Sequence, residues 1–346
     1  MNFNVGGHNV FLIVLVTFIS SVIFVQLSKL IALHTGIMDY PNKRSAHKKP
    51  TPLLGGIGIF LSFLLGYIIF GKESTLMLSI LIASFLILLL GIFDDIKPIP
   101  ARYKIIIHIL VAAVVVFYGG LRLTHFDLFG YYVNFGKWSY PMTIIVIVSI
   151  INAINLIDGL DGLCAGISSI YFLTIGIIAL ILNNLGGLDI ILSFIMFGST
   201  LGFLVHNFPP AKIFMGDTGS TFLGLMISVI MLLGFKTITL TSLIIPMVLL
   251  ILPITDTLFA IIRRTIHKRP IGEADKEHIH HQLLKKLSTR KTIIVIYIIE
   301  IIFSVITILY SIGYRKEMII FYILLAFLIL FLVFKTNVIF DNKEKK

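Results

Sequence analysis

Apolar runs long enough to cross a lipid bilayer recur along this sequence of 346 residues. A transmembrane helix needs about 20 apolar residues. A bilayer admits only helices and closed barrels, because every backbone polar group must find its partner within the protein. The alternation of apolar and polar residues that marks barrel strands is absent from the sequence. Since 58% of the residues are hydrophobic, the sequence predicts an all-α polytopic membrane protein, a helical bundle formed as one domain over residues 1–346.

Hydropathy predicts about 11 transmembrane helices. They are expected at residues 10–33, 53–70, 76–93, 105–119, 140–156, 163–182, 188–205, 220–235, 240–262, 292–312 and 317–334. Residues 1–9 lack the basic residues of a signal peptide, so the first run is expected to be a retained span. The aromatic-rich segment 120–139 is expected to form a small interfacial hairpin.

The distribution of basic residues predicts the orientation. With the N-terminus outside, 22 of the 28 Lys and Arg residues fall in inner segments or at the inner end of a span. Because basic residues concentrate in cytoplasmic loops, we expect a multi-pass protein of the cytoplasmic membrane with a cytoplasmic C-terminus. The net charge of +11 then has a topological origin, and nucleic acid is not expected as a partner.

The stretch NAINLIDGLDGL, residues 152–163, carries regularly spaced polar side chains. It places Asn152, Asn155, Asp158 and Asp161 three residues apart, directly after an apolar run. On a helical or 3₁₀-like turn this spacing aligns the four side chains along one stripe. Such groups are costly at the end of a membrane span unless they have a partner. The stripe therefore indicates a site for a metal, a cation or a polar ligand.

Three more acids lie at span ends on the same predicted side. Asp94 and Asp95 close a span in GIFDDIKPIPARYK, where prolines end the helix. Asp217 lies in HNFPPAKIFMGDTGS, where prolines and glycines predict a tight turn before the next span. An acid pair can merely mark the water boundary, and Asp217 or a neighbouring hydroxyl can merely cap a helix. A helix N-terminus that faces a polar cavity also attracts phosphate.

Two basic segments could hold an anion. Arg264 follows the predicted span 240–262, and His278, His280 and His281 follow in the same inner segment. Basic residues at inner helix ends are often topological, but arginine also binds pyrophosphate bidentately. Zinc is not expected, because the histidine spacing is poor for a helical ligand pair and the sequence has a single cysteine.

The first inner loop, NKRSAHKKPTPLLGG, contains His47 and Lys49. It is either a basic, proline-stiffened connector or a cationic wall for a nucleotide or a lipid head group. Hard oxygen ligands beside cations match a Mg²⁺ site that handles phosphates, with Mn²⁺ as the alternative ion. At the inner leaflet such a site implies one soluble and one lipid-embedded substrate. The residues alone therefore predict a Mg²⁺-dependent phosphoryl-type transferase at the membrane surface.

Five motifs, in order, resemble those of the polyprenyl-phosphate N-acetylhexosamine-1-phosphate transferases. They are HxxPTPxxGG from His47, the pair Asp94-Asp95, NxxNxxDGxDGL from Asn152, FMGDTGS from Phe214, and HIHH from His278. The resemblance covers nearly all the chain. It implies transfer of GlcNAc-1-phosphate from UDP-N-acetylglucosamine to undecaprenyl phosphate at the cytoplasmic face, with release of UMP. This would be the first step of a cell-envelope glycopolymer such as wall teichoic acid, O-antigen or lipopolysaccharide.

The resemblance also implies roles for single residues. Asp217 would be the principal Mg²⁺ ligand, with Asp94 and Asp95 beside the metal. Either of these two could instead deprotonate the acceptor, although a phosphate monoester with a second pKa of about 6 is already mostly ionised. The residues expected to bind substrate lie in inner segments: His47, Lys49, Asn152, Asn155, Asp158, Asp161, Arg264, His278, His280 and His281.

Three alternatives stay open at this point. A phospho-MurNAc-pentapeptide transferase of the same family would carry paired histidines followed by an acid, whereas His281 is followed by Gln282. A secondary transporter would place acids near mid-span within inverted repeats, and no repeat is detectable. A catalytically inactive, lipid-binding relative would be expected to have lost some of the acids. Membrane lipids are expected around the protein, and a homodimer is left open.

Overall fold

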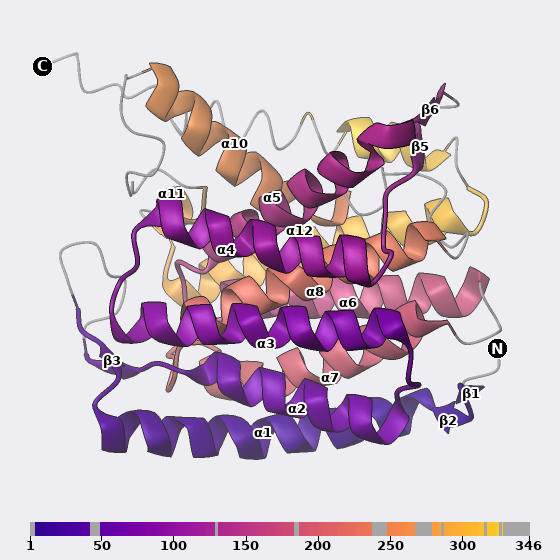
Figure 1. Cartoon of the computed structure of the whole chain (residues 1–346). Helices are drawn as coiled ribbons and strands as arrows, with labels where there is room; N and C mark the ends of the chain where they lie inside the picture. The colour runs from indigo at the N-terminus through magenta and orange to yellow at the C-terminus, as the bar shows by residue number, and fades with distance from the viewer. Residues whose placement is uncertain are drawn as a thin grey trace, which may run out of the picture. The chain divides into compact units, whose positions relative to one another are not determined.

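The chain is described from a computed structural model that covers residues 4–41, 49–128, 131–182, 187–236, 248–266, 279–284, 287–314, 317–324 and 327. The chain divides into two compact units, Met1–Pro246 and Met247–Lys346, which are described separately. Helices make up almost all of the ordered structure drawn in Figure 1. Whether the two units act as one domain stays a prediction.

Within the described residues, the first unit contains eight α-helices. They are α1 (Val10–Thr35), α2 (Gly55–Phe70), α3 (Thr75–Ile96), α4 (Ala101–Ala113), α5 (Ser139–Ile157), α6 (Leu163–Leu182), α7 (Leu188–Asn207) and α8 (Gly216–Lys236). A π-helical turn, η1 (Val114–Tyr118), continues α4, and a 3₁₀ turn, η2 (Gly136–Trp138), precedes α5. The apolar sequence gives every helix a face that can contact lipid or another helix.

The described residues of the first unit also form three short antiparallel strand pairs, one ahead of α1 and two between helices. They are β1 (Asn4–Val5) with β2 (His8–Asn9), β3 (Met38–Asp39) with β4 (Thr51–Pro52), and β5 (His125–Leu128) with β6 (Tyr131–Asn134). The third pair confirms the hairpin expected within 120–139, and its interfacial location stays a prediction.

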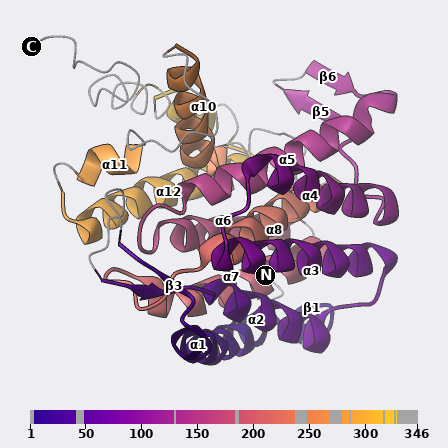
Figure 2. The same ribbon diagram turned by 60° about the vertical axis from the view of Figure 1, so that its left-hand side comes forward.

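Helix α8 is at the centre of the first unit (Figure 2). It contacts α3 and α5 most extensively and also touches α2, α6 and α7, while α1 packs against α2 and α7. Its side chains from Thr218 to Leu233 are almost all buried. A helix that is apolar all round and covered on every side is a core helix. The beginning of α8 is therefore held by several neighbours, and Asp217 is its second residue.

The second unit contains α10 (Ile251–Ile266), α11 (Ile279–Leu284) and α12 (Thr289–Ser311), with helical residues at 317–324. Eight of the described helical segments in the whole chain are long and apolar enough to cross a membrane, and α2 is a shorter apolar helix. This confirms an all-α, multi-pass architecture. The expected spans at 240–262 and 317–334 lie partly outside the described residues, so the total of about 11 stays a prediction, as does the orientation.

Candidate active site

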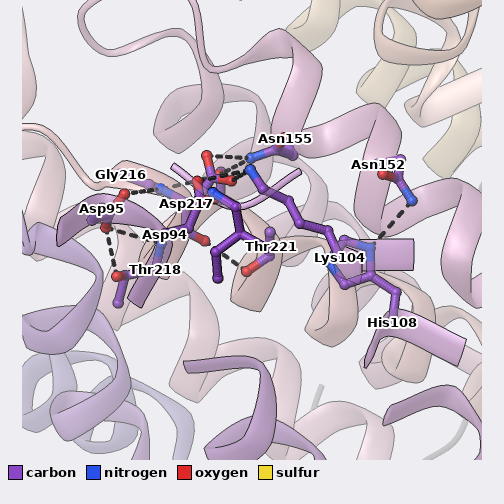
Figure 3. Close-up of polar contacts among 12 residues, drawn as sticks. Asp94, Asp95, Lys104, His108, Asn152, Asn155, Gly216, Asp217, Thr218 and Thr221 are labelled. Carbon is purple, nitrogen blue, oxygen red and sulfur yellow. Dashed lines mark hydrogen bonds and ion pairs between the residues drawn. The ribbon is translucent and has the colours of Figure 1, made fainter. Parts of the chain in front are cut away.

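Four helices of the first unit bring polar side chains together at one place (Figure 3). Asp94 comes from α3, Lys104 from α4, Asn155 from α5 and Asp217 from α8. We call these four residues the Asp217 cluster. Each lies in the first or last turn of its helix, where backbone groups are not all used by the helix itself. The cluster is therefore at the end of the bundle and not midway along it.

Lys104 joins two of the carboxylates. Its Nζ is 2.7 Å from Asp94 Oδ2 and 2.6 Å from Asp217 Oδ2. The turn between α3 and α4 allows this contact, because it reverses the chain and brings Lys104 back to Asp94. Within the turn, Asp94 Oδ1 accepts the N–H of Ile99 at 2.7 Å. Prolines 98 and 100 rule out a continuous helix through this turn. One ammonium group is thus shared between two acids that are far apart in sequence.

Asn155 holds the other side of Asp217. Its Nδ2 donates to Asp217 Oδ1 at 3.0 Å and to the hydroxyl of Ser220 at 2.9 Å. Ser220 also bonds the carbonyl of Gly216, one helical turn earlier. Both oxygens of Asp217 therefore have a partner, and its carboxylate is fixed in direction.

The cluster is negative and partly open to its surroundings. The exposed fraction of the side chain is 11% for Asp94, 25% for Asp217 and 23% for Lys104. Two carboxylates against one ammonium leave an excess of one negative charge. Such a site attracts a further cation, and its residues can reach a ligand from outside the protein.

Asp95 faces a different partner from its neighbour. Its carboxylate accepts the N–H of Asp217 at 2.8 Å, the N–H of Thr218 at 3.2 Å and the Thr218 hydroxyl at 2.6 Å. All three donors belong to the first turn of α8. Adjacent residues point about 100° apart on a helix, which explains why Asp94 reaches the side chain of Asp217 while Asp95 reaches its main chain.

The PTPxxGG part of the first inner loop also contacts the start of α8. The N–H of Phe214 donates to the carbonyl of Pro52 at 2.8 Å, and the N–H groups of Gly55 and Gly56 donate to Phe214 and Met215 at 2.9 and 3.1 Å. This segment is therefore a backbone clamp next to Asp217. Lys49 is exposed near it, and His47 lies outside the described residues.

The predicted polar stripe is only partly formed. Helix α5 ends at Ile157, so Asn152 and Asn155 lie on the helix and the two acids lie beyond it. Asn152 donates to His108 Nδ1 at 3.4 Å and to its own helix. Asp161 accepts the N–H of Ala211 at 2.8 Å and so braces the segment between α7 and α8. Beyond the helix a 3₁₀-like bond joins the N–H of Asp158 to the Asn155 carbonyl at 3.3 Å, and the alignment of all four side chains stays a prediction.

Asp158 is close to the other acids. Burial raises the pKa of the Asp158 carboxyl well above its usual value, and the negative charges of Asp217, Asp95 and Asp161 raise it further. A carboxyl group in such surroundings favours its neutral form or a nearby cation. Asp94, Asp158 and Asp217 thus lie in one region, as the sequence predicted.

The part of the chain that contains the Asp217 cluster is similar to known proteins. Residues 77–235 match the family model described as Glycosyl transferase family 4. The chain is 43% identical over 298 residues to the "Probable undecaprenyl-phosphate N-acetylglucosaminyl 1-phosphate transferase" of Bacillus subtilis, which covers 84% of this chain and 82% of that protein. The chain belongs to glycosyl transferase family 4.

Two further relatives agree. The "Decaprenyl-phosphate N-acetylglucosaminephosphotransferase" of Mycobacterium tuberculosis is 32% identical over 303 residues, 78% of this chain and 74% of the relative. The "Undecaprenyl-phosphate alpha-N-acetylglucosaminyl 1-phosphate transferase" of Haemophilus influenzae is 30% identical over 335 residues, 93% of this chain and 92% of the relative. The family resemblance predicted from the motifs is confirmed, and every member of the Asp217 cluster lies inside the family match.

In this family 4 chain, sequence reasoning missed Lys104 and His108. Lys104 follows Asp94 by ten residues across two prolines, and a reversal at that point was the available signal. His108 lies one turn further along α4 and is buried, and its Nε2 has no partner among the residues that the structure describes. The polar face of α4 therefore extends from the cluster towards Asn152.

The oxygen donors of the Asp217 cluster fit Mg²⁺ that is bound together with a phosphate. No group of three or more His, Cys, Asp or Glu within the described ranges is arranged to hold a metal ion, so a cage made only of protein is not present there. Mg²⁺ is usually bound through one or two carboxylates plus substrate phosphates and water. Asp94 and Asp217, which already share the Lys104 ammonium, would supply such a pair.

Other predicted residues belong to the second unit of this family 4 chain. Arg264 lies in α10 and is buried. His280 and His281 lie in α11, and His278 lies outside the described residues. That these residues join the Asp217 cluster stays a prediction.

Proposed function

We propose that this protein transfers GlcNAc-1-phosphate from UDP-N-acetylglucosamine to undecaprenyl phosphate at the membrane surface and releases UMP. The observation that carries the proposal is the sharing of one Lys104 ammonium by Asp94 and Asp217 at the end of membrane-spanning helices. The names of the two relatives from Bacillus subtilis and Haemophilus influenzae support the same reaction. The reaction would start a cell-envelope glycopolymer such as wall teichoic acid.

The chemistry requires charge neutralisation more than a protein nucleophile. An oxygen of the acceptor phosphate attacks the phosphorus that carries the sugar, and the bond from that phosphorus to the UMP oxygen breaks. Both reactants are anions, and the acceptor phosphate is already mostly ionised at neutral pH. Catalysis of such a transfer depends on positioning and on cations around the phosphoryl group.

Asp217 and Asp94 are the proposed ligands for Mg²⁺, with Mn²⁺ as the alternative. When bound, the metal would neutralise charge on the phosphate oxygens. Asn155 keeps one oxygen of Asp217 directed by its 3.0 Å hydrogen bond. The family resemblance also implied Asp95 beside the metal. Its carboxylate already accepts three hydrogen bonds from α8. We therefore leave Asp95 out of the ligand set.

Lys104 is the proposed phosphate-binding cation. Its ammonium is between two carboxylates and partly exposed, so it can exchange a carboxylate oxygen for a phosphate oxygen with little movement. A lysine ammonium binds phosphate as a compact point charge. Asn152 and Asp158, which lie beside the cluster, are proposed to contact the nucleotide, and Arg264 with the histidines is proposed to bind pyrophosphate or sugar.

One assay tests the proposed function. The purified protein in lipid nanodiscs is given undecaprenyl phosphate with UDP-GlcNAc or with UDP-MurNAc-pentapeptide, each with and without Mg²⁺, and UMP is measured. We expect UMP only with UDP-GlcNAc and Mg²⁺, because His281 is followed by Gln282 and not by an acid. If UMP were released only with UDP-MurNAc-pentapeptide, the protein would be a phospho-MurNAc-pentapeptide transferase. No release with either would refute the transferase proposal.

A further inference from the structure

Asp95 is joined to α8 in a way that its neighbour Asp94 is not. The first N–H groups of a helix have no partner within the helix, and a residue just before the helix usually satisfies them. Here the two donors, the N–H groups of Asp217 and Thr218, are satisfied from α3 by the Asp95 carboxylate, and the Thr218 hydroxyl adds a third bond. A carboxylate at this place also complements the positive end of the helix dipole.

The backbone around the contact is shaped for it. Gly216 has a φ of +67°, a conformation that side-chain-bearing residues rarely adopt, and a Cβ at this position would collide with the Asp95 carboxylate. Gly91, one turn before Asp95 on α3, lies so close to Thr218 that a Cβ there would meet the Thr218 main chain. Thr218 itself is fully buried. The two helices therefore meet main chain to main chain at the point where α8 begins.

We infer that Asp95 is a positioning residue that caps α8 from another helix and so fixes Asp217 relative to Asp94 and Lys104. The inference rests on the proposed function, in which Asp217 and Asp94 act on phosphate. The end of α3 then holds Asp217 twice: Asp95 fixes its main chain, and Asp94 fixes its side chain through Lys104 (Figure 3). The three donors already use three of the roughly four acceptor sites of the Asp95 carboxylate, which leaves little capacity for a metal.

The first test changes the contact between Asp95 and Thr218 from the acceptor side and from the donor side. Asp95→Asn keeps the size of the side chain but replaces one acceptor oxygen with a donor, and Thr218→Val removes only the hydroxyl donor. We expect kcat to fall about 100-fold for Asp95→Asn, because displacement of a catalytic group by about 1 Å has that effect. Thr218→Val should lower kcat in the same direction by a smaller factor. KM for UDP-GlcNAc should stay within about threefold in both, because the substrate contacts remain.

The double variant separates positioning from direct metal binding. If both residues act through one contact, Asp95→Asn with Thr218→Val should have nearly the kcat of Asp95→Asn alone. Thr218→Ser keeps the hydroxyl and should restore wild-type kcat. The matched control is Thr221→Val on the same helix. Among the residues that the structure describes, the Thr221 hydroxyl bonds only the Asp217 carbonyl of its own helix, and its loss should leave kcat unchanged. Wild-type kcat for Thr218→Val, or multiplicative losses in the double variant, would overturn the inference.

Hydrogen exchange tests the cap without relying on the reaction. In the wild-type protein without substrate, amides in residues 214–222 should be protected, and Asp95→Asn should exchange there about tenfold faster, as expected for one lost hydrogen bond. Asp94→Asn should leave this segment protected, because Asp94 makes no bond to the α8 main chain in the described structure. Unchanged exchange in Asp95→Asn would overturn the cap even if the protein proved to have no transferase activity. Faster exchange in a protein without that activity would uphold the cap and refute only the proposed function.

Discussion

Two polar groups in the first unit differ in charge and in exposure. Between α1, α2 and α7, the Ser62 hydroxyl lies 2.6 Å from the Thr17 carbonyl, 2.9 Å from the Ser20 hydroxyl and 3.0 Å from the Ser199 hydroxyl. We call these four residues the hydroxyl network. All four are buried and uncharged. The Asp217 cluster is charged, and three of its side chains are partly exposed.

The difference separates a packing role from a chemical one. In a membrane protein, buried hydroxyls that bond across helices hold those helices together. The hydroxyl network is buried and has no charge to attract a ligand. In the Asp217 cluster, Asp94 and Asp217 can bind another cation in place of the Lys104 ammonium. Lys104 can in turn bind a phosphate in place of a carboxylate. Perturbing the cluster should therefore change turnover, and perturbing the network should change stability.

Removal of divalent metal should have the largest effect. We expect EDTA to abolish UMP release, because the excess negative charge of the cluster would then repel both anionic substrates. Excess Mg²⁺ should restore turnover, and Mn²⁺ should replace it in part. The melting temperature should hardly change, because the hydroxyl network needs no metal. Full turnover in EDTA would contradict the metal assignment.

Asp217→Asn should have the second-largest effect on turnover. We expect kcat to fall about 1,000-fold, the upper range for the loss of one group that stabilises transition-state charge. The protein should remain folded, as measured by its melting temperature and elution profile in detergent, because Asn keeps the side-chain volume. A variant that is folded and fully active would show that Asp217 does not act in the reaction.

Lys104→Gln should lower kcat about 100-fold through loss of the proposed phosphate-binding cation. It should also lower the Mg²⁺ concentration needed for half-maximal rate, because Asp94 and Asp217 would then lack the ammonium that competes with the metal. Lys104→Arg is the matched control and should retain more activity, since it keeps the charge. If Lys104→Gln required more Mg²⁺ than the wild-type protein, competition between lysine and metal would be refuted.

Ser62→Ala should have the smallest effect on turnover, within about twofold, and should lower the free energy of unfolding by about 1 kcal/mol. Unfolding in mixed micelles by denaturing detergent measures this change. Ser228→Ala is the control, because within the described ranges the Ser228 hydroxyl bonds only its own helix, at the Leu225 carbonyl. A large loss of turnover without loss of stability in Ser62→Ala would remove the distinction between the two groups.

Much of the fold followed from hydropathy. The predicted span at 163–182 coincides with α6, because an unbroken apolar run is bounded there by the glycine-rich turn of the polar stretch. The gathering of Asp94, Asn155 and Asp217 was also predictable, since each ends or begins a span on the same predicted side. In both cases a local pattern is enough, because the bilayer fixes where spans begin and end.

The partners of single side chains were not predictable. Lys104 belongs to the cluster only because the turn after α3 reverses the chain, and Asp95 caps α8 only because two helices distant in sequence cross at Gly91 and Gly216. Asp161 braces Ala211 for a similar reason. Such contacts depend on how helices cross, and residue spacing along one segment carries no information on that.

The length of α3 sets the depth of the chemistry. Its 22 residues are about 33 Å long at the usual rise per residue, close to the roughly 30 Å hydrocarbon core of a bilayer. A helix of this length that crosses a bilayer carries its end residues, here Asp94 and Asp95, to the level of the lipid phosphates. For the proposed acceptor, the isoprenoid tail can stay dissolved in the bilayer during transfer, which avoids an extraction cost of about 0.8 kcal/mol per CH₂ group.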